Sequence, residues 1–297
     1  MRRLRLLREF AVHGTVAAAA EALCLTGPAV SQQLAALEKE AGVPLLEKHG
    51  RTLRLTPAGR LLVDHAEVIL GGLAAAEAEL DVLRGGGHGP VRVAAFPSAA
   101  RVLLPAVWRR LAGAVDLTLA EHEPEPAIEA LRRREADIAV VNAYTLVPRD
   151  LPPGCEQHHL QDDPVLLALP PELADRLGLA PDEPVDLARF AEEKWLLPLP
   201  ETACDELTRR ACGAVGFVPR PLVLAGDFSV LTALVAAGAG VTLVPRMALP
   251  AATDPIRLHP LIRPVSRSIY ALTPTGTAEQ PQVRRVLGAL RAVAARP

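Results

Sequence analysis

One run of apolar residues constrains the fold of this chain more than any other feature. Leu62, Ala66, Ile69, Leu73, Ala76, Leu80 and Leu83 follow one another at steps of 4, 3, 4, 3, 4 and 3. A repeat of 3.5 residues is typical of a helix that pairs with another helix along a coiled-coil seam, whereas packing onto its own domain would be served by a 3.6-residue stripe. We therefore expect a helix that is capped by Thr56, opens at Pro57 and reaches about Arg84. A homodimer along this seam is favoured over packing within the chain.

The helix divides the chain into unequal parts. A chain of 297 residues is expected to form two or three compact units, because a single core stops growing near roughly 250 to 300 residues. The predicted units are an N-terminal domain (residues 1–60), a dimerising helix with a hinge (61–90) and a C-terminal domain (91–297). The hinge reads Gly85-Gly86-Gly87-His88-Gly89-Pro90, which predicts a flexible linker. It lacks the Gly-Lys-Ser/Thr ending of a phosphate-binding loop, so nucleotide binding is not expected there.

The charge is distributed unevenly between these parts. Lys and Arg number 9 against 5 Asp and Glu in residues 1–60, a net charge of +4, and 23 against 29 in the remainder, a net charge of -6. The total of -2 therefore conceals a small basic unit. A basic domain raises the expectation of nucleic-acid binding only modestly, so DNA binding depends on the sequence pattern within residues 1–60.

The N-terminal unit is predicted to contain three short helices. The first spans Leu4 to Ala11 and is closed by Gly14; the second spans Val16 to Leu23 and is capped by Thr15. Pro28 suits the first turn of a third helix that reaches about Glu40, because its missing N–H would have no partner there. Two helices joined by a short turn, the second with Ser31, Gln32 and Gln33 near its start, indicate a helix-turn-helix; a plain three-helix packing unit is the alternative.

A short hairpin is predicted after the third helix. Leu53 and Leu55 alternate with Arg54 after a turn at His49-Gly50-Arg51-Thr52. Alternation of this kind is typical of a strand with one buried face, and the basic side chains could contact a phosphate backbone. The hairpin would then be the wing of a winged helix-turn-helix.

Several segments within the first 65 or so residues form a recognisable pattern: Gly14-Thr15-Val16-Ala17-Ala18-Ala19-Ala20-Glu21-Ala22-Leu23, Thr26-Gly27-Pro28-Ala29-Val30-Ser31-Gln32-Gln33-Leu34, Leu37-Glu38, Gly42-Val43-Pro44-Leu45-Leu46-Glu47 and Arg54-Leu55-Thr56-Pro57-Ala58-Gly59. Together they resemble the winged helix-turn-helix of LysR-type transcriptional regulators. The resemblance implies double-stranded DNA as the partner, with DNA-binding residues Thr26, Pro28, Ala29, Ser31, Gln32, Gln33, Arg51 and Arg54. The sequence departs from the family at Gly27, Ala17 and Ala18, where polar residues are common.

The C-terminal unit changes to short apolar runs that alternate with helical stretches. Strands are expected at residues 91–96, 116–119, 137–141, 164–169, 195–198, 221–224, 241–244, 257–262 and 268–272, and helices at 103–111, 127–134, 205–212, 230–237 and 282–295. This alternation predicts a parallel sheet covered by helices. Segments 257–262 and 268–272 are expected to cross back to the first set of strands.

Two α/β lobes joined by two crossings resemble the effector domain of the same family, which is similar to periplasmic solute-binding proteins. Lobe I would comprise about 91–162 and 265–297, and lobe II about 163–264. The most recognisable segment is Leu234 to Pro245, in which Gly238-Ala239-Gly240 predicts a helix cap and a tight turn. The expected fold is an all-α winged helix-turn-helix N-terminal domain, a long linker helix and an α/β two-lobed, periplasmic-binding-protein-like effector domain.

The residues that follow the strands and precede helices are candidates for effector binding, because helix N-termini point free N–H groups at anions. These candidates are Pro97, Ser98, Ala99, Asn142, Thr202, Asp227 and Phe228. Ser98 and Thr202 are expected to hold a carboxylate, while Asp227 disfavours a purely anionic ligand. An amino acid or another zwitterion is therefore favoured as the effector, and an organic acid is the other class considered; each polar residue could be an ordinary helix cap instead.

Rival functions have less support in the sequence. His158-His159 with Asp162-Asp163 suggests a metal site, but adjacent histidines in what is expected to be a Pro-rich loop are usually solvated. No nucleophile sits in a recognisable elbow, so an enzyme is not expected, and neither a cofactor nor a metal is. An exported solute-binding protein is disfavoured because the N-terminus lacks the apolar core of a signal peptide.

Two further observations favour the cytoplasm. The four cysteines do not form a disulfide framework, and the uncharged stretch Phe228 to Pro245 is interpreted as a helix, loop and strand rather than a membrane span. The sequence thus predicts a cytoplasmic, ligand-responsive transcriptional regulator that binds operator DNA as a homodimer or a homotetramer. An enzyme or a solute-binding protein that uses the two-lobed cleft is the alternative.

Overall fold

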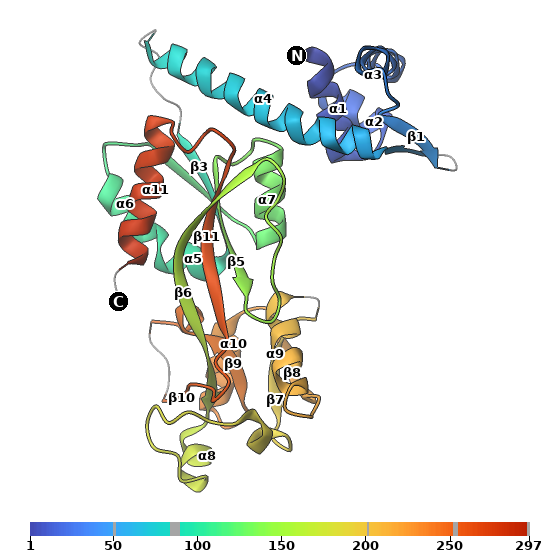
Figure 1. Ribbon diagram of the computed structural model, residues 1–297. Coiled ribbons are helices and arrows are strands. Elements are labelled where there is room, and N and C mark those ends of the chain that lie inside the picture. Colours follow the sequence, from blue (N-terminus) through green and yellow to red (C-terminus); the bar gives the residue numbers. More distant parts are fainter. Residues whose placement is uncertain (50–51, 84–89, 201, 252–254, 296–297) are drawn as a thin grey trace.

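The computed structural model describes residues 1–49, 52–83, 90–200, 202–251 and 255–295 (Figure 1). The helices in this part of the chain are α1 (Arg2–His13), α2 (Val16–Ala22), α3 (Gly27–Ala41), α4 (Pro57–Leu83), α5 (Pro97–Val102), α6 (Leu104–Leu111), α7 (Pro124–Arg132), α8 (Pro171–Arg176), α9 (Ala203–Gly213), α10 (Phe228–Ala236) and α11 (Pro281–Ala294), with the 3-10 turns η1 (Leu187–Phe190) and η2 (Arg246–Ala248). The strands are β1 (Leu46–His49), β2 (Thr52–Leu55), β3 (Val91–Ala95), β4 (Leu117–Glu121), β5 (Ile138–Tyr144), β6 (Cys155–Leu169), β7 (Trp195–Pro198), β8 (Pro221–Ala225), β9 (Thr242–Pro245), β10 (Arg257–His259) and β11 (Ser266–Pro274).

The three N-terminal helices form as the sequence predicts. Gly14 ends α1 in the left-handed region at φ 72°, and the Thr15 hydroxyl accepts a hydrogen bond from the Ala18 N–H at the start of α2. The inner face of α3 packs against α1 and α2 through Val30, Leu34 and Leu37, all of which are buried. The β1–β2 hairpin is antiparallel, although residues 50 and 51 of its expected turn lie outside the described residues.

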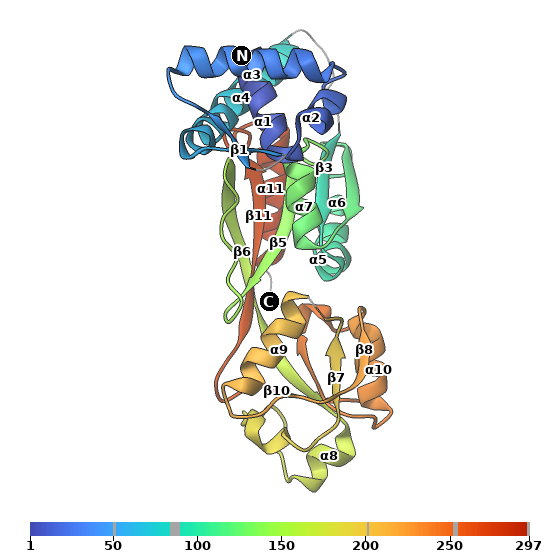
Figure 2. The same cartoon turned by 90° about the vertical axis from the view of Figure 1, so that its right-hand side faces the viewer.

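The long helix α4 begins where predicted. The Thr56 hydroxyl accepts from the Gly59 N–H at 3.0 Å, and a β-carbon at Gly59 would lie 2.1 Å from the Leu45 carbonyl oxygen, so only glycine permits this close approach. Figures 1 and 2 show α4 passing above the first lobe with the other N-terminal helices beside one end of it. The hinge residues 84–89 lie outside the described residues.

The expected seam of α4 is divided between two surfaces. Ala66 is buried within the chain, together with Val63 and Leu70, whereas Ile69 and Leu80 are 45% and 50% exposed. The side chains of the seam residues Ala76 and Leu83 lie outside the described residues. One stripe of α4 therefore packs on its own chain, and part of the 3.5-residue repeat remains on the surface.

Lobe I forms around a sheet with helices on both faces. The strand order in the seven-stranded sheet is β10-β6-β11-β5-β3-β4, with β9 also paired to β6. Ile138 and Val140 of β5 pack into the cluster that includes α6 and α11, whereas Ala139 and Val141 pack against α7 on the other face. This alternation is what a strand covered on both faces requires.

The sheet is mixed, so the prediction of a parallel sheet was wrong in part. Pairing is parallel between β3 and both β4 and β5, and between β7 and β8, but β11 runs antiparallel to β5 and β6. The physical reason is that β6 and β11 both cross between the lobes, in opposite directions, and pair with each other along the way (Figure 1).

The crossing strands also correct two predicted elements. β6 has 15 residues, far more than the predicted strand at 164–169. The prediction missed its first half because polar side chains there, such as His158 and Asp162, do not form the apolar pattern that indicates a strand. Segment 257–262 does not cross back: β10 pairs with Leu167 to Leu169 at the far end of β6, and β11 alone returns. The short helix α5 after β3 was not predicted as a separate element.

Lobe II surrounds its own core. β7 and Phe190 pack with β6, β9 and α9, and both Trp195 and Phe190 are fully buried. The predicted cap and turn after α10 are confirmed, since Gly238 has φ 79° and the Ala239 N–H bonds to the Leu234 carbonyl. A β-carbon at Gly240 would lie 2.2 Å from the Lys194 carbonyl oxygen, which explains the second glycine of the segment.

Candidate functional site

The first candidate surface is the N-terminal end of α3. Thr26, Pro28, Ser31 and Gln32 are exposed there, and Ala29 is half-buried. The Thr26 side chain makes no capping hydrogen bond to α3. Because the opposite face of α3 is held in the core, the structure presents small polar groups on a rigid helix end, which is the geometry of a recognition helix in a major groove.

Gln33 differs from its neighbours on α3. Its Oε1 accepts a hydrogen bond from Arg3 Nε at 3.0 Å, and Arg3 also pairs with Glu40. The side chain is half-buried against α1. Gln33 therefore has a structural partner that the sequence pattern could not reveal, because Arg3 is 30 residues away.

The hairpin beside α3 carries the predicted wing residues. Arg54 is exposed on β2 and lies across from Glu47 in the ladder, while Arg51 lies outside the described residues. Glu38 of α3 accepts hydrogen bonds from the Leu45 and Leu46 N–H groups, both at 2.9 Å. Glu38 thus ties the hairpin to the recognition helix, a role that sequence reasoning missed.

The second candidate site lies where the two crossing strands meet both lobes. Arg267 of β11 and Asp163 of β6 are each 3% exposed, and Arg267 Nε donates to Asp163 Oδ2 at 2.7 Å. Arg267 Nη2 donates to Ser98 Oγ at 2.8 Å, and its guanidinium stacks 5.0 Å from the centre of the Phe96 ring. The second oxygen of Asp163 accepts from the Met247 N–H at 2.9 Å. This cluster joins α5 in lobe I to η2 in lobe II.

Two further buried groups surround Arg267. Burial raises the pKa of the Tyr144 hydroxyl well above its usual value, and burial raises the pKa of the Cys204 thiol to about 11. Both groups are therefore neutral at physiological pH, and the Arg267–Asp163 pair carries the charge in the cluster. The sequence pointed to Ser98 but not to Arg267, Tyr144 or Cys204, and it treated Asp163 only as a candidate metal ligand.

The remaining predicted effector residues are placed around this junction in different ways. Ala99 and Asn142 are buried, Pro97 is exposed and Phe228 is half-buried. Thr202 and Asp227 are exposed caps: Thr202 accepts from the Asp205 N–H at 3.2 Å, and Asp227 accepts from the Ser229 N–H at 2.7 Å. That backbone hydrogen bond from Ser229 is the main cause of the lowered pKa of Asp227. Thr202 and Asp227 therefore act as helix caps in this structure, which was the alternative to effector binding.

Arg101 connects α5, which carries Ser98, with the residues near Asp227. From α5 it donates to the carbonyls of Leu249 and Met247, at 2.9 and 3.0 Å, and its charge also lowers the pKa of Asp227 slightly. The helix that carries Ser98 therefore faces the start of α10 across the junction between the lobes.

The two adjacent histidines lie in a different setting from the one expected. His158 and His159 lie on β6 rather than in a Pro-rich loop, with His158 Nε2 3.0 Å from Thr273 Oγ1 and His159 Nε2 3.1 Å from Asp162 Oδ1. Within the described ranges, no three His, Cys, Asp or Glu side chains gather as a metal site would require. Among those same residues, none of the helices has the length and apolar character needed to span a bilayer.

Comparison with known proteins assigns both parts of the chain to one family. Residues 1–60 match the bacterial regulatory helix-turn-helix protein, lysR family, and residues 84–295 match the LysR substrate binding domain. The HTH-type transcriptional regulator TfdS of Cupriavidus pinatubonensis is 33% identical over 258 residues, which cover 82% of this chain and 81% of the relative. The probable HTH-type transcriptional regulator LrrA of Synechococcus elongatus is 27% identical over 294 residues, covering 98% and 96%.

A solved structure shows the same fold over nearly the whole chain. Full-length CbnR complexed with its target DNA has a TM-score of 0.54 and 23% identity, covering 98% of this chain and 99% of that one. The predicted fold is therefore confirmed, and the relatives with known roles are transcriptional regulators. With a helix-turn-helix and a substrate-binding domain that both match, the chain belongs to the LysR family of transcriptional regulators, which bind DNA and respond to small-molecule effectors.

Proposed function

We propose that this regulator binds operator DNA through the start of α3 and the β1–β2 hairpin. The observation that carries the proposal is the exposed polar end of α3 above a buried apolar face. Thr26, Pro28, Ala29, Ser31, Gln32 and Gln33 would lie at the groove, with Gln33 acting through Arg3, and Arg51 and Arg54 would contact the phosphate backbone.

Fluorescence anisotropy with labelled duplexes tests this part. We expect the full chain to bind a non-specific duplex with an affinity that falls steeply between 50 and 200 mM salt, because each neutralised phosphate releases counterions. An affinity that does not change with salt, or the absence of binding at low salt, would show that this surface does not contact DNA.

We propose that the chain forms a homodimer through the exposed part of the α4 seam. Ile69 and Leu80 support this, since they are apolar, half exposed and placed on the 3.5-residue repeat. Sedimentation velocity should show that Ile69→Asp with Leu80→Asp shifts the chain towards monomer. The matched control is Leu61→Asp, whose parent side chain is 60% exposed but lies off the seam. Equal behaviour of the two variants would place the dimer contact elsewhere.

We propose that the effector is an amino acid or an organic acid bound at the lobe junction. Ser98 supports the carboxylate contact, because its oxygen already accepts from Arg267 and its hydroxyl hydrogen can donate to a ligand oxygen. Asn142, Thr202, Asp227 and Phe228 would complete the site with Pro97 and Ala99. A thermal-shift screen of amino acids and organic acids should find a stabilising ligand, and Ser98→Ala with Thr202→Ala should abolish the shift. A shift that persists in this variant would remove both residues from the site.

We infer that effector binding changes the angle between the lobes, which alters how dimers sit in a tetramer and so the spacing of their DNA contacts. The crossing strands β6 and β11 support this, since the lobes are joined through them. The protein would act in the cytoplasm and would not be an enzyme, in line with relatives that are transcriptional regulators.

A further inference from the structure

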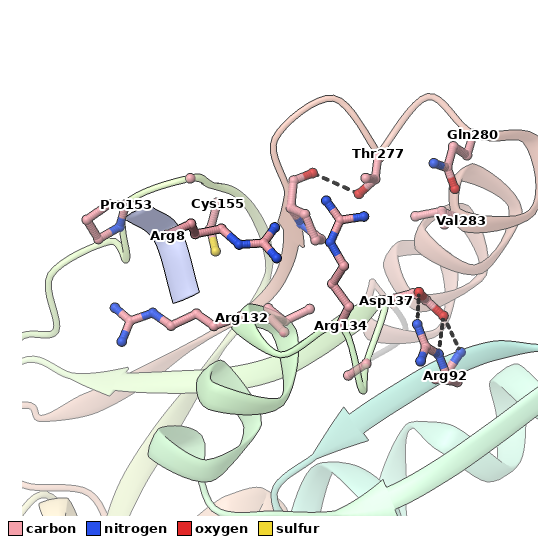
Figure 3. Close-up of a pocket in the computed structure, with 14 residues that line it drawn as sticks. Arg8, Arg92, Arg132, Arg134, Asp137, Pro153, Cys155, Thr277, Gln280 and Val283 are labelled. Carbon is pink, nitrogen blue, oxygen red and sulfur yellow. Dashed lines mark hydrogen bonds and ion pairs between the residues drawn. The ribbon is translucent and has the colours of Figure 1, made fainter. Parts of the chain in front are cut away.

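The four arginines of α1 lie in different surroundings. Arg2 and Arg5 are exposed, and neither side chain makes a hydrogen bond or ion pair within the described part of the chain. Arg8 pairs with Glu9 and lines a pocket whose other lining residues belong to lobe I (Figure 3). Arg3 instead contacts α3, the helix that carries the proposed DNA contacts. Arg3 therefore connects α1 with the recognition helix.

Arg3 is held at two points on one side of α3. Its Nε donates to Gln33 Oε1 at 3.0 Å, and its Nη1 pairs with the Glu40 carboxylate. Gln33 and Glu40 are seven residues apart, close to two helical turns, so both lie on the side of α3 that faces α1. An ion pair as exposed as this one contributes little to stability. The main consequence of the contact is therefore the orientation of the Gln33 amide.

The contact decides which atom of the Gln33 amide is free. A guanidinium has hydrogen-bond donors only, so the atom that faces Arg3 has to be the amide oxygen. The amide nitrogen Nε2 makes no hydrogen bond within the described residues, and it is not one of the buried atoms that lack a partner there. Nε2 of this half-buried side chain is therefore open to solvent and to a bound molecule.

The Gln33 amide lies towards the end of α3 that we assign to the groove. Residues four apart share a face of a helix, and long helical side chains lean towards the N-terminus. The Gln33 side chain therefore lies over the turn that holds Ala29, whose methyl group leaves the amide uncovered. The two N–H donors of the amide are thus available beside the exposed Ser31 and Gln32.

We propose that Arg3 is a positioning residue that makes Gln33 bind guanine, and not adenine, in the major groove. This role of Arg3 rests on the proposed contact between α3 and operator DNA. Glutamine binds adenine by accepting from N6 with its oxygen and donating to N7, whereas guanine presents two acceptors, N7 and O6. With Arg3 on the oxygen, a bond from adenine N6 would bring its amino hydrogens against the guanidinium, donor against donor. The N–H donors of Gln33 therefore favour the acceptors of guanine.

Selection of duplexes from a random library by the full chain, followed by fluorescence anisotropy on the selected sites, tests the proposal. Gln33→Ala identifies the base pair that Gln33 contacts, because base preference should disappear at that position alone. There we expect the unaltered protein to prefer guanine over adenine by about fivefold or more, the lower end of what one base contact provides. Arg3→Met should bring this ratio to about one or reverse it, because the freed amide can pair with adenine. Arg3→Lys, which keeps a donor for the oxygen, should retain the preference for guanine.

Two further variants separate positioning from charge. Arg2→Met removes the same charge from α1 but no contact with α3, so it should leave the base preference as it is. Glu40→Ala keeps the charge of Arg3 and removes its second contact, so it should also lower the preference for guanine, by less than Arg3→Met does. Thermal unfolding shows whether each variant is folded, and Glu40→Ala serves if Arg3→Met is not.

Loss of the Arg3 role and loss of DNA binding give different results. If the chain selects a sequence but Arg3→Met weakens binding to every duplex equally, or Gln33→Ala changes no base preference, the role proposed for Arg3 is wrong. It is also wrong if Arg2→Met alters the preference as Arg3→Met does, or if the unaltered protein prefers adenine at that position. If the chain selects no sequence at all, the contact between α3 and operator DNA is wrong as well.

Discussion

The recognition helix and the lobe junction place their polar groups in opposite environments. At the start of α3, Ser31 and Gln32 are exposed and the buried side of the helix is entirely apolar. At the junction, the polar groups themselves are buried, and Arg267 with Asp163 forms an ion pair in which each partner is 3% exposed. A surface that binds a partner by its exposed groups can change without unfolding the protein, whereas a buried ion pair is part of what holds the two lobes together.

This contrast has a physical basis in desolvation. Removing one partner of a buried ion pair leaves an uncompensated charge, while removing an exposed polar group costs the fold almost nothing. Changes at the junction should therefore appear in stability, and changes at α3 should appear in DNA affinity alone. Four measurements test that division.

The largest effect is expected for Arg267→Met, which leaves Asp163 buried without its partner. We expect the free energy of unfolding in urea to fall by about 3 to 5 kcal/mol. The control is Arg263→Met, because the exposed Arg263 makes only a surface contact with the Ala214 carbonyl in the described part of the chain. Adding Asp163→Leu to Arg267→Met should restore much of the loss. A change below about 1 kcal/mol would mean that the pair does not hold the junction.

The buried thiol of Cys204 gives a pH-dependent effect at the same junction. The pKa of this thiol in the folded protein is about 11, above the usual 9.0. The stability that depends on the neutral thiol is therefore complete below pH 9 and is lost as the pH rises through 11. Stability should therefore decline across this range by about 2 to 3 kcal/mol more in the unaltered protein than in Cys204→Ala. Cys24→Ala, which removes an exposed thiol, should leave the decline unchanged. If the stability of Cys204→Ala and that of the unaltered protein fell equally between pH 9 and 11, the prediction would be wrong.

A smaller effect, on binding only, is expected at α3. Ser31→Ala with Gln32→Ala should weaken operator binding by about 1 to 3 kcal/mol, roughly 5- to 150-fold, and should leave the unfolding temperature unchanged. Gln33→Ala should have a lesser effect on affinity, because the Gln33 oxygen is engaged by Arg3. Gln157→Ala, on the exposed edge of β6, is the matched control. A large loss of stability in the Ser31/Gln32 variant would break the contrast between the two regions.

The smallest effect is expected for Arg54→Ala in the hairpin. If Arg54 contacts one phosphate, the slope of log affinity against log salt should decrease by about 0.9, equally for all duplex sequences. The exposed Arg109 of α6 provides the control, since Arg109→Ala should leave the slope as it is. A change confined to one operator sequence would instead show that Arg54 contacts a base.

The local elements of the molecule could be predicted well. Gly14, Thr15 and Thr56 act within a few residues of the helices that they cap, and the α3 core face follows a helical period. The division of the chain into domains and the individual contact residues remain predictions. What the sequence missed was long-range: Arg3 is 30 residues from Gln33, and Arg267 is 104 residues from Asp163.

The sequence by itself determined the winged helix-turn-helix, the long helix and the α/β character of the remainder, because caps and periodicity act over one or two turns of chain. Only the tertiary structure decided that β6 and β11 run between the lobes and turn a parallel sheet into a mixed one. The structure also decided that one stripe of α4, including the seam residue Ala66, packs on its own chain and that Ser98 is held by Arg267. These features depend on which distant segments pack together. Because burying an unpaired charge costs free energy, each buried charged group then needs an oppositely charged or hydrogen-bonding partner.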